Sequence, residues 1–294
     1  MITSKLRGGL GNQLFQYAIG LQLSTELNTM LKLDLSDYEK QDNIRSYKLD
    51  VFNIEVPIAT SEEVRKYEKK QKQITSLKGY RFFKKLIPLK WFSIIQEPHY
   101  HYTPSINKIG KNHLLIGNWQ TEKYFTKVIP QLRKNLTLKN KLSDNAQHYA
   151  NKISSVHAIS IHIRRGDYVS VPKFAERFGT CTTEYYQIAT QYLLTRIPDA
   201  HFFVFTDDLN WVKAHPELFS GCERVTYIEN TTADYEDLIL MSKCKHHILA
   251  NSSFSWWGAW LNASTQKIIT APKIWFAGLP HDTSDLIPES WIRL

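Results

Sequence analysis

Two adjacent arginines and an aspartate follow an apolar run in the segment HIRRGDY, residues 162–168. A guanidinium group presents a planar fork of N–H donors that matches phosphate oxygens, so Arg164 and Arg165 could hold an anionic ligand. The same letters also allow an Arg-Gly-Asp adhesion tripeptide or an ordinary solvated strand end. A tripeptide recurs by chance in many chains, and the choice therefore depends on the surrounding sequence.

Two further polar clusters follow apolar runs in the same half of the chain. The first cluster, Thr206-Asp207-Asp208, comes directly after HFFVF. The second, within NSSFSWW at 251–257, comes after HHILA. Serine hydroxyls and free N–H groups at a helix start bind phosphate well, and ligands of open parallel sheets bind beyond the carboxyl ends of the strands. We therefore predict a pyrophosphate site that includes Arg164, Arg165, Asp207, Asp208, Asn251, Ser252, Ser253 and Ser255.

The sequence offers little to a divalent metal. No two aspartates lie two residues apart, so the Asp-x-Asp pair of many sugar-nucleotide enzymes is missing. Asp207 and Asp208 are adjacent, and an extended backbone would direct them to opposite sides. His99 and His101 could share a face, but no carboxylate or thiol stands beside them, and we interpret them as loop histidines. The prediction is a pyrophosphate site without metal.

A glycine-rich loop, RGGLGNQ, lies near the N-terminus. It lacks the third glycine of a dinucleotide fingerprint and the Lys-Ser/Thr of a P-loop. Gly8, Gly9 and Gly11 still permit close approach of the backbone to a ligand, while Asn12 and Gln13 supply amides suited to sugar hydroxyls. A simple tight turn is the alternative.

Alternating strands and helices would position these residues. The chain opens with a strand at 2–6, a glycine turn and an amphipathic helix, and further strands are expected at 31–36 and 114–120. The second half alternates more clearly, with strands at 157–164, 201–208, 224–229, 246–251 and 267–272 and helices at 183–197, 211–219, 234–244 and 254–262. This alternation predicts an α/β fold with parallel sheets. Trp256, Trp257 and Trp260 lie at helical spacing, which favours core packing over stacking on a ligand.

Composition sets wider limits. The chain has 294 residues, a formal net charge of +9 and three cysteines without a CxxC pair. The charge suggests an anionic partner, and the cysteines are typical of reduced thiols.

No signal peptide and no membrane span are expected, so we predict a cytoplasmic protein. Residues 65–90 carry ten basic residues against the single acid Glu68, with aromatics between them. This segment could lie on an anionic membrane face or be a solvated basic surface.

Several long segments together resemble glycosyltransferase family 11, the α-1,2-fucosyltransferases. They are GGLGNQLFQYA at 8–18, HIRRGDYV at 162–169, FTDDLNW at 205–211 and MSKCKHHILANSSFSWWGAWLN at 241–262, with shorter matches at 35–38, 117–125 and 271–276. The resemblance spans nearly the whole chain and is weakest near 65–95. It implies a GT-B-like fold of two Rossmann-type domains that face a central cleft, an acceptor-side domain at 1–145 and a GDP-fucose-binding domain at 146–294.

The resemblance also implies an activity. It implies inverting transfer of L-fucose from GDP-β-L-fucose to the 2-hydroxyl of a terminal galactose in an oligosaccharide or lipid-linked glycan, without metal or cofactor. His162, Arg164, Arg165 and Asp167 would belong to the donor motif, with Arg164 nearest the β-phosphate and Arg164 and Asp167 as the catalytic pair. Because side chains alternate along a strand, we expect Arg165 to turn away from Arg164 and to hold the loop through Asp167 or neighbouring carbonyls.

Three alternatives remain at this point. Another GDP-fucose transferase could form an α-1,6 linkage or modify protein, and the two remaining classes are an adhesion module and a nucleic-acid binder. We expect no nucleic-acid partner, because no exposed aromatics on a basic sheet are indicated. Peripheral contact of residues 65–95 with the inner face of a bacterial cytoplasmic membrane is an expectation based on charge. The catalytic base is not identified, and Glu122 is the one acid considered in the N-terminal half.

Overall fold

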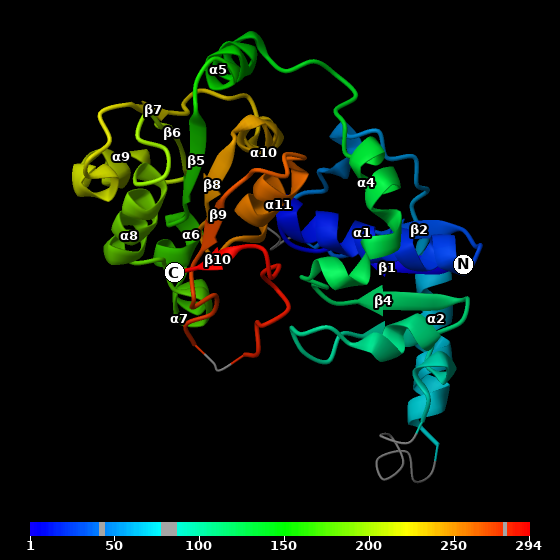
Figure 1. Cartoon of the computed structure of the whole chain (residues 1–294). Coiled ribbons are helices and arrows are strands. Elements are labelled where there is room, and N and C mark those ends of the chain that lie inside the picture. Colours follow the sequence, from blue (N-terminus) through cyan, green and yellow to red (C-terminus); the bar gives the residue numbers. More distant parts are fainter. Residues whose placement is uncertain (41–44, 78–86, 279–280) are drawn as a thin grey trace. The chain divides into compact units, whose positions relative to one another are not determined.

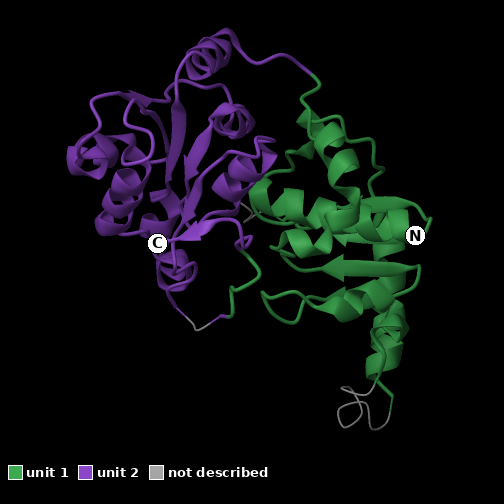
Figure 2. Cartoon of the chain, in the orientation of Figure 1, with its two compact units in different colours: residues 1–139, 282–286 green, residues 140–281, 287–294 purple. Residues whose placement is uncertain are grey.

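The computed structural model describes residues 1–40, 45–77, 87–278 and 281–294. The chain forms two compact α/β units, one of residues 1–139 with 282–286 and the other of residues 140–281 with 287–294 (Figure 2). The division lies at Lys139 and Asn140, within the polar stretch 139–147, whereas the sequence placed it after residue 145. The return of 282–286 to the first unit was not predicted. There Asp285 accepts a hydrogen bond from the backbone N–H of Tyr102 (2.8 Å) and pairs with Lys123.

The first unit is built on a four-stranded parallel sheet in the order β2-β1-β4-β3 (Figure 1). Its strands are β1 (Ile2–Lys5), β2 (Leu31–Asp34), β3 (Ile94–Gln96) and β4 (His113–Ile116). Its helices are α1 (Leu10–Glu26), α2 (Ser61–Thr75) and α4 (Ile129–Asn135), with 3₁₀ turns η1 (Leu49–Val51), η3 (Leu89–Trp91), η4 (Pro104–Lys108), η5 (Glu122–Tyr124) and η6 (Thr126–Val128). The three predicted strands are confirmed, although β4 ends earlier than expected, and β3 was missed.

Local chemistry explains how α1 and α2 begin. Gly8 has φ +76°, and a Cβ added there would lie 2.7 Å from the Asn12 side chain, so the turn before α1 requires glycine. At the start of α2, Thr60 accepts a hydrogen bond from the Glu63 N–H while the Glu63 carboxylate accepts one from the Thr60 N–H. This capping box satisfies two backbone donors that a helix start leaves without helical partners.

The second unit contains a six-stranded parallel sheet in the order β10-β9-β8-β5-β6-β7. Its strands are β5 (Ala158–Ile163), β6 (His201–Thr206), β7 (Val225–Tyr227), β8 (His246–Ile248), β9 (Ile269–Ala271) and β10 (Ile292–Arg293). Its helices are α5 (Asp144–Ser154), α6 (Gly166–Ser170), α7 (Pro172–Phe178), α8 (Thr183–Leu194), α9 (Leu209–Lys213), α10 (Asp234–Lys243) and α11 (Ser253–Leu261), with η7 at Pro216–Phe219. The predicted alternation is confirmed. The single helix expected at 211–219 is instead α9 followed by η7, since Pro216 has no N–H to continue a helix.

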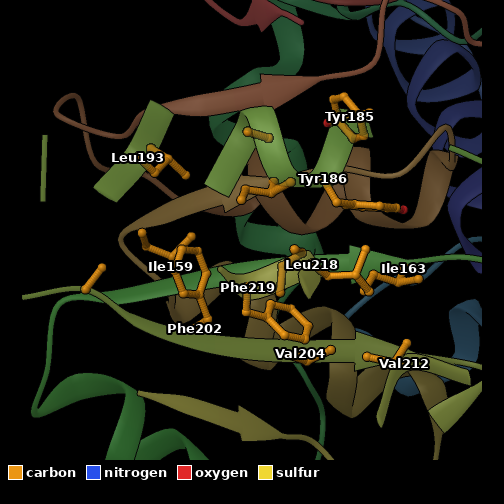
Figure 3. Close-up of a cluster of buried hydrophobic side chains, with 14 residues drawn as sticks. Ile159, Ile163, Tyr185, Tyr186, Leu193, Phe202, Val204, Val212, Leu218 and Phe219 are labelled. Atoms are coloured by element: carbon orange, nitrogen blue, oxygen red, sulfur yellow. The ribbon is translucent and has the colours of Figure 1, made fainter. Parts of the chain in front are cut away.

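Both faces of this sheet are covered. Figure 3 shows Phe202 and Val204 of β6 in one cluster with Tyr186 and Leu193 of α8. The intervening Phe203 and Phe205 belong to a second cluster with α5 and α10, through residues that include Ala146, Ala150, Ile153, Leu240 and Met241. Successive residues of a strand point to opposite faces, so a strand buried on both sides is apolar throughout. This is the reason that FFVF, residues 202–205, is a continuous apolar run.

The tryptophans of α11 are core residues, as predicted. Trp256 and Trp257 are 0% exposed and Trp260 is 4% exposed. Trp256 also packs against Trp291, which precedes β10. His247 of β8 also has a structural role, since it is fully buried with its ring nitrogens 2.8 Å from the Ser160 hydroxyl and 2.9 Å from the Asn262 amide.

Glu236 of α10 fixes the beginning of the second unit. Its carboxylate is 1% exposed and accepts hydrogen bonds from the N–H and hydroxyl of Ser143, the N-cap of α5, at 2.7 and 3.0 Å. It also accepts from the N–H and hydroxyl of Thr232, at 2.9 and 2.8 Å. Burial raises the pKa of Glu236, but these four hydrogen bonds outweigh burial and hold the pKa below its usual value.

We expect Glu236→Gln to destabilise the second unit by about 2–3 kcal/mol at neutral pH, because an amide N–H₂ would face N–H and O–H donors. A carboxylate whose pKa is lowered on folding stabilises the protein above its unfolded pKa, and this contribution is lost as the pH falls. The difference in unfolding free energy between the wild type and Glu236→Gln should therefore become smaller at acidic pH. Chemical denaturation at neutral and acidic pH measures it, with the exposed Glu223→Gln as the matched control. A variant as stable as this control would contradict the assignment.

Candidate active site

Arg164 lies just beyond the end of β5, a strand flanked by β8 and β6. Its guanidinium Nη2 is 2.5 Å from Oδ1 of Asp167 and its Nη1 is 2.8 Å from Oδ2 of Asp207. The side chain is 21% exposed. The two carboxylates come from α6 and from the loop after β6, so they fix the orientation of the guanidinium and leave its other N–H groups available.

Arg165 is held by a separate set of contacts. Its Nε is 3.1 Å from Oδ2 of Asp208, and its guanidinium lies over the Trp211 ring at 3.8 Å from the centroid. Its backbone N–H donates to Oδ1 of Asp207 at 2.8 Å. Arg165 therefore differs from Arg164 in every side-chain partner.

One expectation about this pair is wrong. Asp167 pairs with Arg164 rather than with Arg165, whose partners are Asp208 and Trp211. The strand ends at Ile163, so its alternation does not extend to the arginines, and α6 brings Asp167 back toward Arg164 at a spacing of three residues. The adhesion interpretation also loses support, since the Asp167 side chain is 13% exposed and ion-paired.

Gly166 is required by the approach of Asp207. A Cβ at Gly166 would lie 2.4 Å from Oδ2 of Asp207 and 2.9 Å from its carboxyl carbon. Both oxygens of Asp207 are used, one by the Arg164 side chain and the other by the Arg165 backbone. The glycine between arginine and aspartate thus serves packing at this strand end.

His162 is the last buried polar side chain of β5. It is 6% exposed, and burial, followed by the nearby Arg164 charge, lowers its pKa to about 3. The ring is therefore neutral at physiological pH. Its Nδ1 is buried without a hydrogen-bond partner among the described residues. A buried nitrogen of this kind beside an arginine can make a hydrogen bond to a ligand.

The NSS segment mostly stabilises the fold. The Asn251 amide donates to the carbonyls of Phe178, Gly179 and Trp275, at 3.0, 3.2 and 3.2 Å. Ser252 is the N-cap of α11 and accepts from the Phe254 N–H.

The expectation that Ser255 exposes its hydroxyl is wrong. Ser255 is 1% exposed and its hydroxyl donates to the carbonyl of Ser252 at 3.2 Å. Asn251 is likewise 3% exposed, with its amide hydrogens directed into the protein. Among the serines of this segment, Ser253 at the start of α11 is the one that is half-buried rather than buried. The nine-residue helix α11 begins here.

The glycine loop of the first unit forms a helix start at the carboxyl end of β1. Gly9 is the N-cap of α1, and Gly11 is buried within its first turn. Gln13 is 0% exposed: its amide donates to the carbonyls of Gly8 and Ser46, and its oxygen accepts from the Lys48 N–H. Gln13 therefore ties residues 46–48 to the loop instead of presenting its amide to solvent. Asn12 accepts a hydrogen bond from the Gln120 amide at 2.8 Å.

Sequence reasoning missed several polar residues beside this loop. The Glu97 carboxylate, directly after β3, accepts hydrogen bonds from the N–H groups of Asn118 and Trp119, at 2.6 and 2.9 Å. Burial raises the pKa of Glu97. Trp119 has φ +56°, a left-handed conformation that is uncommon outside glycine, and Arg7 reaches the Asn118 side chain at 3.4 Å. Glu122 opens η5 and is half-buried.

Asp237 was also missed in the second unit. It lies in the first turn of α10, which follows β7 and so begins at the carboxyl edge of the sheet. Burial raises its pKa to about 6; a hydrogen bond from Thr231 opposes this shift, and the neighbouring Asp234 and Glu236 add to it. The only sequence signal was the cluster of acids in DYED.

Comparison with known proteins places these features in a family. The family model described as glycosyl transferase family 11 matches residues 1–292. The chain is 38% identical over 296 residues to an alpha-1,2-colitosyltransferase of Escherichia coli, covering 100% of this chain and 99% of that protein. It is 32% identical over 315 residues to the O-antigen biosynthesis glycosyltransferase WbnK of Escherichia coli, with 99% of both chains covered. It is also 23% identical to galactoside alpha-(1,2)-fucosyltransferase 1 of Mus musculus, over 62% of this chain and 56% of that protein.

Solved structures share the fold at low identity. NodZ alpha-1,6-fucosyltransferase co-crystallised with GDP matches with a TM-score of 0.51 and 15% identity, over 88% of this chain and 91% of that one. POFUT1 in complex with GDP-fucose matches with a TM-score of 0.51 and 14% identity, over 92% of this chain and 97% of that one. The parallel sheets of the two units and these neighbours show a GT-B-like α/β fold, as predicted. With the family model spanning all but the last residues, the chain belongs to glycosyl transferase family 11 and is a glycosyltransferase.

Proposed function

We propose that this protein transfers L-fucose from GDP-β-L-fucose to the 2-hydroxyl of a terminal galactose, with inversion at the fucose anomeric carbon and without metal. The observation that carries the proposal is the oriented Arg164 guanidinium at the end of β5, in a chain of glycosyl transferase family 11. The 1,2 linkage is supported by the names of two relatives, one bacterial colitosyltransferase and one mammalian fucosyltransferase.

Arg164 would act on the leaving group. As the bond between fucose and GDP breaks, negative charge builds on the β-phosphate, and a donor that is already oriented stabilises this charge at no reorganisation cost. Asp167 and Asp207 provide that orientation by holding Nη1 and Nη2. The remaining guanidinium N–H groups are the ones offered to the diphosphate, with the buried Nδ1 of His162 as a further contact. Asp167 would thus be a positioning residue.

The proposal of metal independence is supported by the ion pairs that the carboxylates of the site make with arginines. Asp167, Asp207 and Asp208 each pair with an arginine, so their charge is already compensated by the protein. Among residues 1–40, 45–77, 87–278 and 281–294, no three His, Cys, Asp or Glu side chains are grouped as a metal site requires. The arginines would take the role that a divalent ion has in enzymes with an Asp-x-Asp pair.

A second donor sugar has a specific observation in its favour. The relative with 38% identity along the whole chain is named as a colitosyltransferase, and colitose is fucose without its 3-hydroxyl. The nucleotide part of the site would be the same for either sugar. GDP-colitose is therefore the alternative donor, and α-1,6 transfer or protein O-fucosylation is the alternative in linkage.

We expect turnover with GDP-fucose and a galactose-terminated acceptor, with fucose attached at O-2 of galactose, and no loss of rate in excess EDTA. The assay offers GDP-fucose and GDP-colitose to a panel of galactosides and establishes the linkage of each product by NMR. A strong preference for GDP-colitose, or a product linked elsewhere, would replace this assignment of donor or linkage. Loss of turnover on chelation, restored by manganese or magnesium, would refute the metal-free mechanism.

The two arginines should respond differently to the same substitution. Arg164→Lys keeps a charge but loses the planar fork, so we expect a loss of about 2–4 kcal/mol in transition-state stabilisation. Arg165→Lys should lose less kcat/KM for the donor and more thermal stability, because its stacking on Trp211 joins α9 to the strand end. The kcat/KM for the donor and the melting temperature are measured for Arg164→Lys and for Arg165→Lys. Equal kinetic losses, or a larger one at Arg165, would mean that the roles are reversed.

Asp237 offers a test of donor recognition. We propose that its carboxylate accepts N–H groups of the guanine base, since a buried ion with a raised pKa at a nucleotide-binding edge is retained at a cost in stability. A carboxyl group whose pKa is raised on folding destabilises the protein as the pH rises through the range from its unfolded pKa to about 6. Asp237→Asn should therefore melt at a higher temperature at pH 7.5 and bind GDP at least tenfold more weakly. Unchanged GDP affinity by calorimetry would exclude this role.

A further inference from the structure

The positive excess of the chain lies in residues 1–139, which make up nearly all of its first unit. Residues 1–139 hold 23 lysines and arginines against 12 acids, a net charge of +11. Residues 140–294 hold 14 against 16, a net charge of −2. The proposed nucleotide site belongs to the second of these segments, so binding of an anionic donor does not account for the basic character of the protein.

Helix α2 carries part of this charge, with five cations against the three acids Glu62, Glu63 and Glu68. Its buried stripe consists of Val64 and Tyr67, which pack with Leu114 of β4. Its remaining surface carries five exposed cations, Arg65, Lys66, Lys69, Lys70 and Lys72. Three of them, Arg65, Lys69 and Lys72, line an open groove together with Glu68, Gln73 and Ser76.

The spacing of these cations is unfavourable for a helix in water alone. Arg65 and Lys69, and likewise Lys66 and Lys70, are separated by four residues, so like charges lie next to each other on the surface. The ion pair within α2 that involves this set joins Lys66 to Glu62 at 2.9 Å. An external anionic surface would relieve the remaining repulsion, and the C-terminal part of α2 projects beyond the strands of its sheet (Figure 1).

Exposed apolar side chains adjoin the cations. Gln71 of α2 accepts hydrogen bonds from the N–H groups of Ser93 and Ile94, both at 3.1 Å, which places the end of η3 beside the helix. Trp91, two residues before Ser93, is 64% exposed, and Leu77, just after the helix, is also 64% exposed. Tryptophan at the boundary of a basic surface is suited to the interface of a lipid bilayer, where its ring meets both acyl and polar groups.

We propose that α2 and η3 dock this protein on an anionic lipid bilayer, with the α2 cations against lipid phosphates and Trp91 in the interface. The docking face consists of Arg65, Lys66, Lys69, Lys70, Lys72, Leu77, Lys90 and Trp91. No helix in the described part of the chain is long and apolar enough to cross a membrane, so attachment through the docking face would be peripheral. The exposed Leu77 favours a bilayer over a nucleic acid, because an aliphatic side chain neither binds phosphate nor stacks on bases.

The test compares binding of the full chain to phosphatidylcholine vesicles with and without phosphatidylglycerol. We expect binding to the anionic vesicles only, weakening as salt is added. Each lysine or arginine near such a surface contributes roughly a fivefold factor, so Arg65→Gln/Lys69→Gln/Lys72→Gln should reduce the partition coefficient more than tenfold. Brominated lipids should quench the wild type more than Trp91→Phe, which would place this ring in the interface.

A matched control removes the same charge elsewhere in the unit. Lys108, Lys111 and Lys139 are exposed, and their replacement by glutamine should leave vesicle binding nearly unchanged. Both triple variants should melt like the wild type and keep their turnover on a water-soluble acceptor, so the result is independent of the proposed function. Equal binding to neutral and anionic vesicles, equal losses in the two triple variants, or binding to an oligonucleotide in preference to vesicles would overturn the proposal.

Discussion

The Asp207 carboxylate connects the parts of the candidate site. One oxygen accepts the Arg165 backbone N–H and the other meets the Arg164 guanidinium, while its approach leaves no room for a side chain at Gly166. The backbone turn after β5 and, together with Asp167, the direction of Arg164 thus depend on one residue of the loop after the neighbouring strand β6. Asp208 beside it caps α9 and holds Arg165. Two consecutive aspartates of the loop after β6 therefore help to orient two consecutive arginines of the turn after β5.

The sequence predicted the sheet of the second unit because parallel strands buried on both faces are short apolar runs, and helices must lie between them. It also predicted that polar residues would meet at the strand ends. The partners of Arg164 and Arg165 could not be predicted, since they depend on the single residue at which β5 ends. The burial of Ser255 and Asn251 depends on carbonyls of the chain before α11 and of residues distant in sequence, such as Phe178 and Trp275. The same limit hid Glu97, whose partners lie 21 and 22 residues away.

The two units differ in the charge that they present. The second unit has no positive excess, since residues 140–294 hold 14 lysines and arginines against 16 acids, and its arginines near the strand ends are paired with carboxylates. Specific recognition of a diphosphate there would come from a few oriented donors and not from a long-range field. The first unit carries its excess as exposed lysines and arginines, five of them on α2, a distribution suited to a broad anionic surface. The positive net charge of the whole chain therefore reflects its first unit and does not apply to its second unit.

Glu236 and Asp237 are neighbours in one helical turn, yet their pKa values are shifted in opposite directions. Glu236 is 1% exposed, yet four hydrogen bonds hold its pKa below the usual value, so its charge stabilises the fold. Asp237 has Thr231 as a hydrogen-bonding partner but lies close to other acids, and its pKa is raised to about 6. Burial raises the pKa of both carboxylates, and the number of hydrogen-bond donors decides whether the net shift is downward or upward. The raised pKa of Asp237, at the edge of the sheet where open parallel sheets bind ligands, is the observation that supports its proposed contact with a ligand that supplies the missing donors.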